Sequence, residues 1–183
     1  MADHLAFLKR RLDDVNFRAL AAIADDRLHA FVADAVELCD PESVWISTDS
    51  PEDFAKTRDM AVRTREETPL AIAGHTVHFD GMEDQGRDRE VTKYLVPAGH
   101  SLEKALNQIE REEGLAEVRS LMKGVMRGRT MIVRFMTLGP NNSAFSIPCV
   151  ECTDSFYVSH SLNLLYRPGY EEFRAAGGNA PFF

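Results

Sequence analysis

One stretch, from Met126 to Val158, constrains the fold of this chain more than any other part of the sequence. After a basic turn, two runs rich in β-branched and apolar residues, Arg129 to Leu138 and Phe145 to Cys152, predict two long strands. The linker between them contains Gly-Pro and indicates a turn. Asp154 or Ser155 then caps a helix, because short polar side chains accept hydrogen bonds from the free N–H groups of a first helical turn. The stretch therefore predicts two strands joined by a turn and followed by a helix.

The N-terminal region predicts helices. Apolar residues recur at near-helical spacing over residues 3–23. A second helix is expected to begin at Asp25 or Asp26, either of which can cap it. It ends before Pro41, because proline disfavours helical geometry in the residue that precedes it. We interpret residues 1–34 as a helical lead-in to the domain.

A strand–helix–strand unit is predicted next. Val44 to Thr48 is a short β-rich run. Ser50 and Pro51 then supply a cap and a first-turn proline for a helix that runs to about Arg65. The apolar run from Pro69 to Ala73 is expected to be the second strand of a βαβ unit.

The middle and the end of the chain predict one polar loop and further helices. Residues 80–90 are nearly all polar with two glycines, and such a segment cannot bury itself, so it is expected to be a surface loop. A strand over 92–96 is followed by a helical stretch over 101–126, interrupted near Gly114. A last helix is expected over 168–177, with a proline in its first turn and a glycine at its end.

Composition limits the class of protein. At 183 residues, with 44% hydrophobic and 27% charged residues, the chain suits one soluble domain with its own core. A net charge of -8 weighs against nonspecific nucleic-acid binding, since no basic stripe offsets it. No apolar run is long enough to span a membrane, and we see no secretion signal at the start. The odd number of cysteines, three, does not form a disulfide framework, which favours a reducing cytoplasm.

Cys149 and Cys152 form a CxxC pair. A structural zinc site needs a second pair of ligands, and none is nearby in the sequence. Redox chemistry of the thioredoxin type places the pair at a helix start, whereas these residues fall within a predicted strand and point to opposite faces. We therefore interpret both as small buried side chains, with a functional role as the less favoured alternative.

His75, His78 and Asp80 bring two imidazoles and a carboxylate close together in sequence. On a strand, His78 and Asp80 share one face while His75 lies on the other, which is poor geometry for a metal unless other segments contribute ligands. The alternative is a strand end with solvated or hydrogen-bonded histidines. A metal-dependent enzyme built on these three residues is a third, weaker hypothesis.

Arginines occur in two places where an anion could bind. Arg87 and Arg89 lie in the polar loop, and a glycine before Arg87 lets the backbone approach a ligand closely. The alternative is that both pair with acids of the same loop. A second set of cations follows the long helical stretch, where a helix C-terminus with dipole-favoured cations is the simpler interpretation. Its members are Lys123, Arg127, Arg129 and Arg134.

Several motifs together resemble the GTP-dependent phosphoenolpyruvate carboxykinases, in particular their archaeal branch. The stretch from Met126 to Val158 carries GRTM, then GP, then TDSFYV. The others are ELCDPESV from Glu37, AGHTVHFDG from Ala73, GRDRE from Gly86 and NLLYRPGYEEF from Asn163. Their order and spacing make the resemblance specific from about Ala35 to the end of the chain.

The resemblance implies a fold and an activity. Family members convert oxaloacetate and GTP to phosphoenolpyruvate, GDP and CO2, in gluconeogenesis, with Mn2+ and a second divalent ion. Their N-terminal lobe is an α/β domain, a mixed sheet flanked by helices, that forms one wall of the substrate cleft. By position, the family's substrate-binding arginine falls on Arg87, where it would hold a carboxylate or phosphate of the substrate.

The resemblance also implies what residues 1–183 lack. The sequence contains no G-x-x-x-x-G-K-[ST] phosphate loop, and the family's metal ligands, reactive cysteine and guanine pocket come later than Phe183. We therefore expect a single substrate-side domain with no catalytic and no metal-binding residue of its own, inactive alone. It would be either an N-terminal fragment or the product of a shortened gene. The alternative hypothesis is a non-catalytic assembly module that pairs with a separate nucleotide-binding polypeptide.

Overall fold

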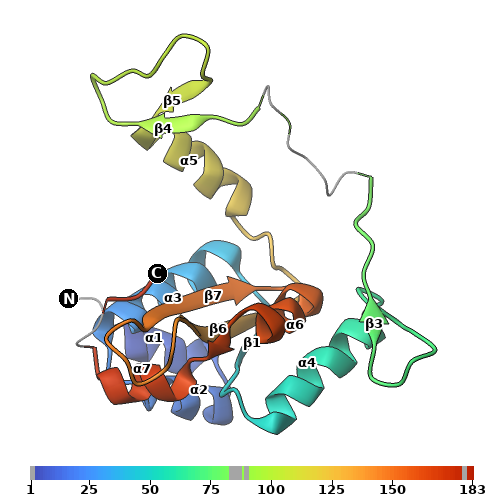
Figure 1. Ribbon diagram of the computed structural model, residues 1–183. Coiled ribbons are helices and arrows are strands. Elements are labelled where there is room, and N and C mark those ends of the chain that lie inside the picture. Colours follow the sequence, from blue (N-terminus) through green and yellow to red (C-terminus); the bar gives the residue numbers. More distant parts are fainter. Residues whose placement is uncertain (1–2, 83–87, 89–90, 179–180) are drawn as a thin grey trace.

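The computed structural model describes residues 3–82, 88, 91–178 and 181–183. A mixed sheet forms the centre of the molecule (Figure 1). Its strand order is β1-β6-β7, and β8 pairs with the far end of β6. β1 runs parallel to β6, whereas β7 and β8 are antiparallel to it. The strands are β1 (Ser43–Ile46), β6 (Thr130–Leu138), β7 (Ile147–Thr153) and β8 (Arg167–Pro168). The expected mixed sheet is therefore confirmed, as are the two long strands.

Helices cover both faces of this sheet because side chains alternate along β6. Met131, Val133 and Phe135 point into the larger core, which α1, α2, α3 and α7 cover. Ile132 points to the other face, where Trp45 and Phe156 pack with α4. The helices are α1 (His4–Arg11), α2 (Asp14–Ala21), α3 (Asp26–Cys39), α4 (Pro51–Arg63), α5 (Arg111–Met122), α6 (Phe156–Leu165) and α7 (Tyr170–Ala176).

Local caps fix three of these helices where the sequence predicts them. The Asp25 carboxylate accepts hydrogen bonds from the second and third backbone N–H groups of α3. Ser50 caps α4, with Pro51 in its first turn, and Ser155 rather than Asp154 caps α6. At the end of α3, Asp40 adopts the left-handed conformation before Pro41. These starts and the end of α3 are confirmed because each depends on a side chain within a few residues of it.

The first predicted helix is in fact two. α1 ends at Arg11, and α2 begins after Asp13, whose carboxylate accepts a hydrogen bond from the Asn16 N–H at 2.8 Å. Leu12 between them is extended and buried. The prediction of a single helix was wrong because the Asp13 side chain offers the backbone N–H groups a local alternative to the hydrogen bonds within a helix.

The predicted βαβ unit is also wrong. The partner of β1 is β6, and the run after α4 turns back on itself as a hairpin of β2 (Thr68–Pro69) and β3 (Thr76–Val77). Gly74, with φ of +81°, closes the turn, and Leu70 N–H donates to the His75 carbonyl. Leu70 and Ile72 remain exposed, so their apolar character did not indicate a buried strand.

The predicted helix over 101–126 is wrong in its first half. β4 (Tyr94–Val96) pairs in parallel with β5 (Gln108–Glu110), and only Arg111–Met122 forms α5. Glu110 starts this helix by accepting bonds from the N–H groups of Glu112 and Glu113. Gly114 is not an interruption: it lies against β4, where a Cβ atom would collide with the Leu95 Cδ2 atom.

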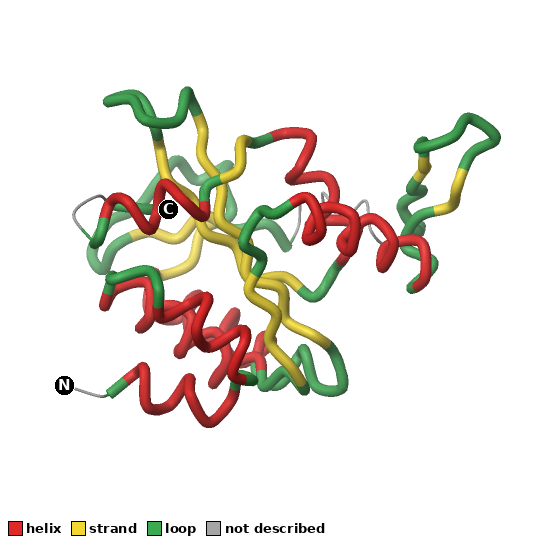
Figure 2. The backbone as a smooth tube through the Cα atoms, turned by 90° about the horizontal axis from the view of Figure 1, so that it is seen from below, coloured by secondary structure: helices red, strands yellow, loops and turns green. Residues whose placement is uncertain are grey.

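The β4–β5–α5 unit stands away from the sheet in both views (Figures 1 and 2). Its described connection to the body is at the end of α3, where Gly124 N–H donates to the Leu38 carbonyl and Met126 N–H to that of Cys39. At the other end of the chain, Pro168 belongs to β8 and not to the last helix, α7, which begins at Tyr170. α7 ends at Ala176 with Gly177 as its C-cap, so the stop at this glycine is as expected. Within the described ranges, no helix is both long and apolar enough to cross a membrane.

Candidate functional site

Arg87, the residue that the resemblance assigns to substrate binding, lies outside the described residues, as does Arg89. The described chain leads toward Arg87 through the β2–β3 hairpin and residues 78–82. The candidate site is therefore the base of this loop, which we call the loop stem. It comprises Glu66, Glu67, His78, Asp80, Ser155, Tyr157 and His160.

His78 holds the end of β3 in place through three contacts. Its Nδ1 atom lies 2.6 Å from the Glu66 carbonyl oxygen, and because a carbonyl can only accept, Nδ1 is the donor. Its Nε2 atom is 3.3 Å from the Asp80 carboxylate. The ring stacks on Tyr157 with centroids 3.6 Å apart and planes 14° apart. His78, which directly follows β3, thus contacts Glu66, Asp80 and Tyr157, and these contacts fix the end of the strand.

Glu66 connects the hairpin with the start of α6. Its Oε2 atom accepts hydrogen bonds from the Ser155 hydroxyl at 2.5 Å and from the Tyr157 N–H at 2.9 Å. Its Oε1 atom accepts from the Thr64 hydroxyl at 2.7 Å. A carboxylate at a helix N-terminus is favoured by the helix dipole and by the free N–H groups there.

Glu67 and His160 form a second acid–histidine pair of the loop stem, in addition to Asp80 and His78. Glu67 is buried, and its Oε1 atom is 2.7 Å from the Nδ1 atom of His160 on α6. The backbone N–H of Glu67 donates to the Ala61 carbonyl at the end of α4. Two consecutive glutamates therefore fasten the start of the hairpin to two turns of the same helix.

The three residues proposed as a metal set do not act together. His78 and Asp80 do lie within contact distance, but His75 is exposed and its ring takes no part in the loop stem. Both ring nitrogens of His78 already face oxygen atoms. Across the described part of the chain, no three His, Cys, Asp or Glu side chains gather as metal ligands. The alternative of a hydrogen-bonded strand end is the one that the structure supports.

The predicted basic set does not converge either. Arg127 pairs with Asp40 at 2.9 Å, and Arg129 pairs with Asp154 at 2.7 Å. These two ion pairs are partly exposed and hold the turn before β6 against neighbouring elements. Lys123 lies at the end of α5, beside a groove between α3 and α5. Arg127 and Arg129 thus make separate local ion pairs, and the described contacts do not bring the set together as one anion site.

Arg134 is the side chain that sequence reasoning misjudged. Only 2% exposed, it lies on the α4–α6 face of β6 and contacts Asp49 at 3.3 Å. Its guanidinium also donates to the Ser159 hydroxyl at 3.0 Å and to the Asn163 side chain at 2.5 Å. The signal available in the sequence was a lone arginine inside an otherwise apolar strand.

Asp49 completes this buried cluster. Its Oδ2 atom accepts from the N–H groups of Gly169 and Tyr170, at 2.9 and 3.0 Å, so it caps α7 from a distance. Burial raises the pKa of Asp49, against the opposing effects of the two backbone N–H groups and Arg134. Burial likewise lowers the pKa of Arg134, against the effect of Asp49. The cluster joins the segment between β1 and α4 to β6, α6 and α7, and is therefore structural.

Cys149 and Cys152 lie on β7 and on opposite faces of the sheet, as predicted, but both are only partly buried, so the expectation of two buried side chains was wrong. Cys149 pairs with Met136 and Cys152 with Val133, which belong to different sides of β6. Burial raises the pKa of Cys152 to about 12, so its thiol is not ionised near neutral pH. Neither geometry nor ionisation supports redox chemistry by this pair.

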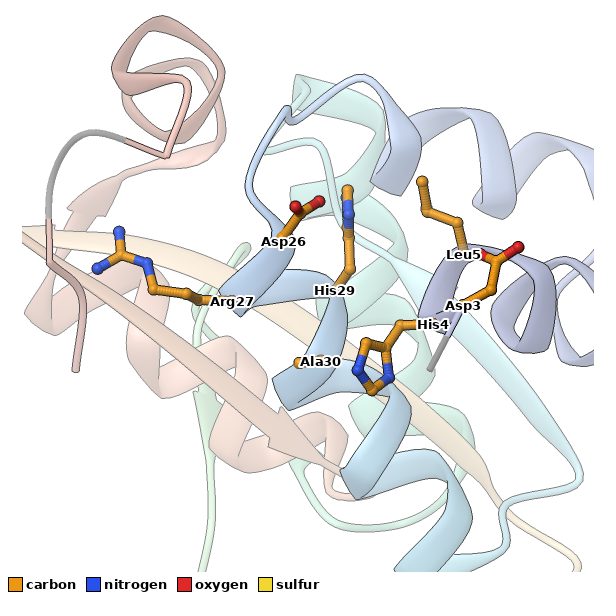
Figure 3. A pocket seen from close by; sticks show the side chains of 7 residues that line it. All are labelled: Asp3, His4, Leu5, Asp26, Arg27, His29 and Ala30. Atoms are coloured by element: carbon orange, nitrogen blue, oxygen red, sulfur yellow. The ribbon is translucent and has the colours of Figure 1, made fainter. Parts of the chain in front are cut away.

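A pocket of about 360 Å3 lies between the starts of α1 and α3 (Figure 3). Its lining residues are distant in sequence from those of the loop stem. Asp3, Asp26 and Arg27 line it together with two histidines. One of these, His29, is buried, and its Nε2 atom faces the Leu20 carbonyl. Charges of both signs line the pocket, and none of the motifs singled out in the sequence reaches it, so it is not part of the candidate site.

Comparison with known proteins decides the family. A family model described as the phosphoenolpyruvate carboxykinase N-terminal domain matches residues 30–183. The chain belongs to this family. The match covers the sheet, the loop stem and the segment with Arg87, and it confirms the resemblance drawn from the sequence.

Relatives of this carboxykinase domain cover nearly the whole chain. A phosphoenolpyruvate carboxykinase (GTP) of Pyrococcus abyssi is 48% identical over 96% of the chain and 28% of its own length. That of Pyrococcus furiosus is 45% identical over 100% of the chain and 29% of its own length. That of Saccharolobus solfataricus is 42% identical over 94% of the chain and 28% of its own length. The chain thus corresponds to the N-terminal portion of these enzymes and spans less than a third of their length.

Proposed function

We propose that this domain binds the anionic substrate of a GTP-dependent phosphoenolpyruvate carboxykinase and has no carboxykinase activity alone. The reaction converts oxaloacetate and GTP to phosphoenolpyruvate, GDP and CO2. The observation that carries the proposal is the family match over residues 30–183, which includes the loop. The loop stem supports it, because a loop that must present a charged side chain to a ligand needs a fixed base.

Arg87 is the residue that would contact the substrate. A guanidinium binds a carboxylate or phosphate through two parallel hydrogen bonds, and such charge-assisted bonds are stronger than neutral ones. In an acidic chain with net charge -8, a dianion binds only where cations gather locally. Arg87 lies in one of the two places where the sequence has such cations.

Mn2+, the second divalent ion and GTP are assigned to the part of the relatives that this chain does not span. In the family that the sequence resembles, the metal ligands and the phosphate loop come later than Phe183. On this proposal, the share of the reaction that falls to this chain is to bind and orient the substrate. We also propose a cytoplasmic location, which agrees with three cysteines that form no disulfide.

Titration with phosphoenolpyruvate tests the role of Arg87. The 183-residue chain is labelled with 15N, and the saturable chemical-shift changes give the affinity. Arg87→Ala should weaken binding at least about tenfold, since hydrogen bonds to charged groups contribute about 1.5–3 kcal/mol. Arg10→Ala on the exposed side of α1 removes the same charge elsewhere and is the matched control. Equal affinities for the wild type and Arg87→Ala would refute the assignment.

A second candidate function is assembly with a separate polypeptide that carries the nucleotide lobe. One observation favours it: α5 and the residues after it expose Val118, Leu121, Met122 and Val125, which recur at helical spacing. Exposed apolar stripes of this kind often mark interfaces. Co-elution of this chain with the remaining part of the Pyrococcus furiosus carboxykinase in gel filtration, abolished by Leu121→Asp, would support assembly. Separate elution of the two polypeptides would refute it.

A further inference from the structure

A groove of about 500 Å3 separates two helix faces of opposite charge. Asp34 and Glu37 line it from α3, whereas Arg119 of α5 and Lys123, directly after α5, line it from the other side. Each wall follows helical spacing, since side chains three or four residues apart share one face of a helix. All four residues are exposed, and the ion pairs found among the described residues include none of them. The two walls therefore carry opposite charges that are not paired with each other.

The helices on either side of the groove meet at their C-terminal ends. There the Gly124 N–H donates to the Leu38 carbonyl at 2.8 Å, and from this point α5 leads away from the body (Figure 1). Asp34 lies four residues before Leu38, and Arg119 lies five residues before Gly124, which is about 6 and 8 Å along the two helices. The acid and the base are thus at matching distances from the junction, so a closing movement would bring them together.

The junction itself permits such a movement. Lys123 is extended at the end of α5, and Gly124 has φ of +69°. The atoms nearest to a Cβ atom built at Gly124 belong to the flexible Arg127 side chain and not to backbone. Within α5 only Gly114 and Leu115 are shielded from solvent, so most of the helix surface is open to a further contact. A hinge needs only a few such residues to absorb a change in φ and ψ.

We propose that the β4–β5–α5 unit is an arm that closes on α3, pairing Arg119 with Asp34 and Lys123 with Glu37. Closure depends neither on the substrate nor on the role proposed for Arg87. Because exposed ion pairs are weak and are screened by salt, the arm opens and closes reversibly, and ionic strength sets the balance between the two states.

Closure also affects the apolar side chains of the arm. Val118, Leu121 and Met122 lie on a different face of α5 from the residues that line the groove, because their positions in the helix alternate with those of the groove face. They stay exposed when the arm closes. The closed arm therefore holds this apolar surface in one orientation relative to the body of the domain.

Chemical cross-linking measures closure directly. Ala30 lies four residues before Asp34, on the same face of α3, and Ala116 lines the groove from α5. The variant Ala30→Cys/Ala116→Cys, with the three native cysteines replaced by alanine, is treated with a short bis-maleimide reagent. Cross-linking should be at least about threefold slower in about 0.5 M than in about 20 mM NaCl, because salt screens exposed charges. The reaction of each cysteine alone with a monomaleimide corrects for its intrinsic reactivity.

Charge reversal tests whether the proposed pairs cause closure. In the same cysteine variant at low salt, Arg119→Glu/Lys123→Glu should slow cross-linking at least about threefold, because like charges then face each other across the groove. Adding Asp34→Lys/Glu37→Lys exchanges the charges of the two walls and should restore the rate. Urea unfolding shows that each variant has the fold of the parent chain.

A matched control separates pairing from net charge. Lys9→Glu/Arg10→Glu on α1 makes the same change in net charge at two exposed residues outside the groove, and should leave the cross-linking rate unchanged. An equal fall in this control would overturn the proposal. So would equal rates before and after charge reversal in α5, a rate that the exchanged charges do not restore, or a rate that is the same at low and high salt.

Discussion

Replacement of Asp49 with Ala should cost this domain a large part of its stability. Asp49 and Arg134 are 4% and 2% exposed, so the substitution leaves the Arg134 guanidinium buried without its ionic partner. It also removes the acceptor for the N–H groups of Gly169 and Tyr170 at the start of α7. Breaking a buried ion pair from one side typically costs about 3–5 kcal/mol.

That loss is large compared with the total stability of a domain, which is about 5–15 kcal/mol. For a chain of this size, each kcal/mol lowers the melting temperature by about 2–4 °C, so the expected drop is about 6–20 °C. Urea unfolding at neutral pH measures the loss directly. The single tryptophan, Trp45, is buried beside Ile132 and Phe156 and reports unfolding by fluorescence.

Two matched variants test the cause. Asp49 has φ of +60°, a conformation that asparagine tolerates, so Asp49→Asn keeps the turn and one acceptor and should cost less than Asp49→Ala. The double variant Asp49→Ala/Arg134→Met should also cost less than Asp49→Ala alone, because no unpaired charge remains. If Asp49→Ala lowers the free energy of unfolding by less than about 1 kcal/mol, and the slope of that free energy against urea concentration is unchanged, the argument that the pair is buried and structural is refuted.

Two further outcomes are expected. Hydrogen bonds from Arg127 and Arg11 lower the pKa of Asp40 from its ordinary value of 3.8, so its carboxylate stabilises the folded state above pH 3.8 and loses this effect as the pH falls through the pKa of the folded state. The urea midpoints of the wild type and Asp40→Asn should therefore differ by a constant amount near neutral pH and converge in acid. A difference between the two midpoints that grows in acid would contradict this sign. Gly169→Ala places a Cβ atom 2.5 to 2.7 Å from three backbone atoms of Met136, so it should lower the free energy of unfolding by about 2 kcal/mol or more in the same assay. In Gly177→Ala the new Cβ atom meets no atom within 4 Å, but the φ of +54° is unfavourable for alanine, so this variant should cost about 1 kcal/mol.

The sequence was sufficient for those features that depend on neighbouring residues. Asp25, Ser50 and Ser155 begin helices where their positions predicted, because a capping side chain bonds to N–H groups two or three residues away. β6 and β7 were also predictable, since long β-branched runs separated by Gly-Pro favour strands. The family, too, could be identified from motifs in order along the chain.

The same local reasoning failed where two signals competed. Apolar residues at near-helical spacing suggested one helix over 3–23, but the Asp13 side chain ended that pattern. Leu102 and Leu106 suggested a helix, yet both are exposed, and β5 pairs with β4 a few residues later. Periodicity describes which face could be buried; it does not say whether another element is present to bury it.

Only the tertiary structure decided how the loop stem and the buried cluster form. Glu66 and Tyr157 are 91 residues apart, and Arg134 and Asp49 are 85 apart, so no local pattern relates them. Their contacts exist because β1 lies beside β6 and α6 packs on α4, an arrangement set by which apolar faces bury one another. The sequence alone thus determined the starts of α3, α4 and α6, the strands β1, β6 and β7, and the family. The fold determined which distant charges meet, because burial brings them together in surroundings of low polarity, where each ion pair is stronger than in water.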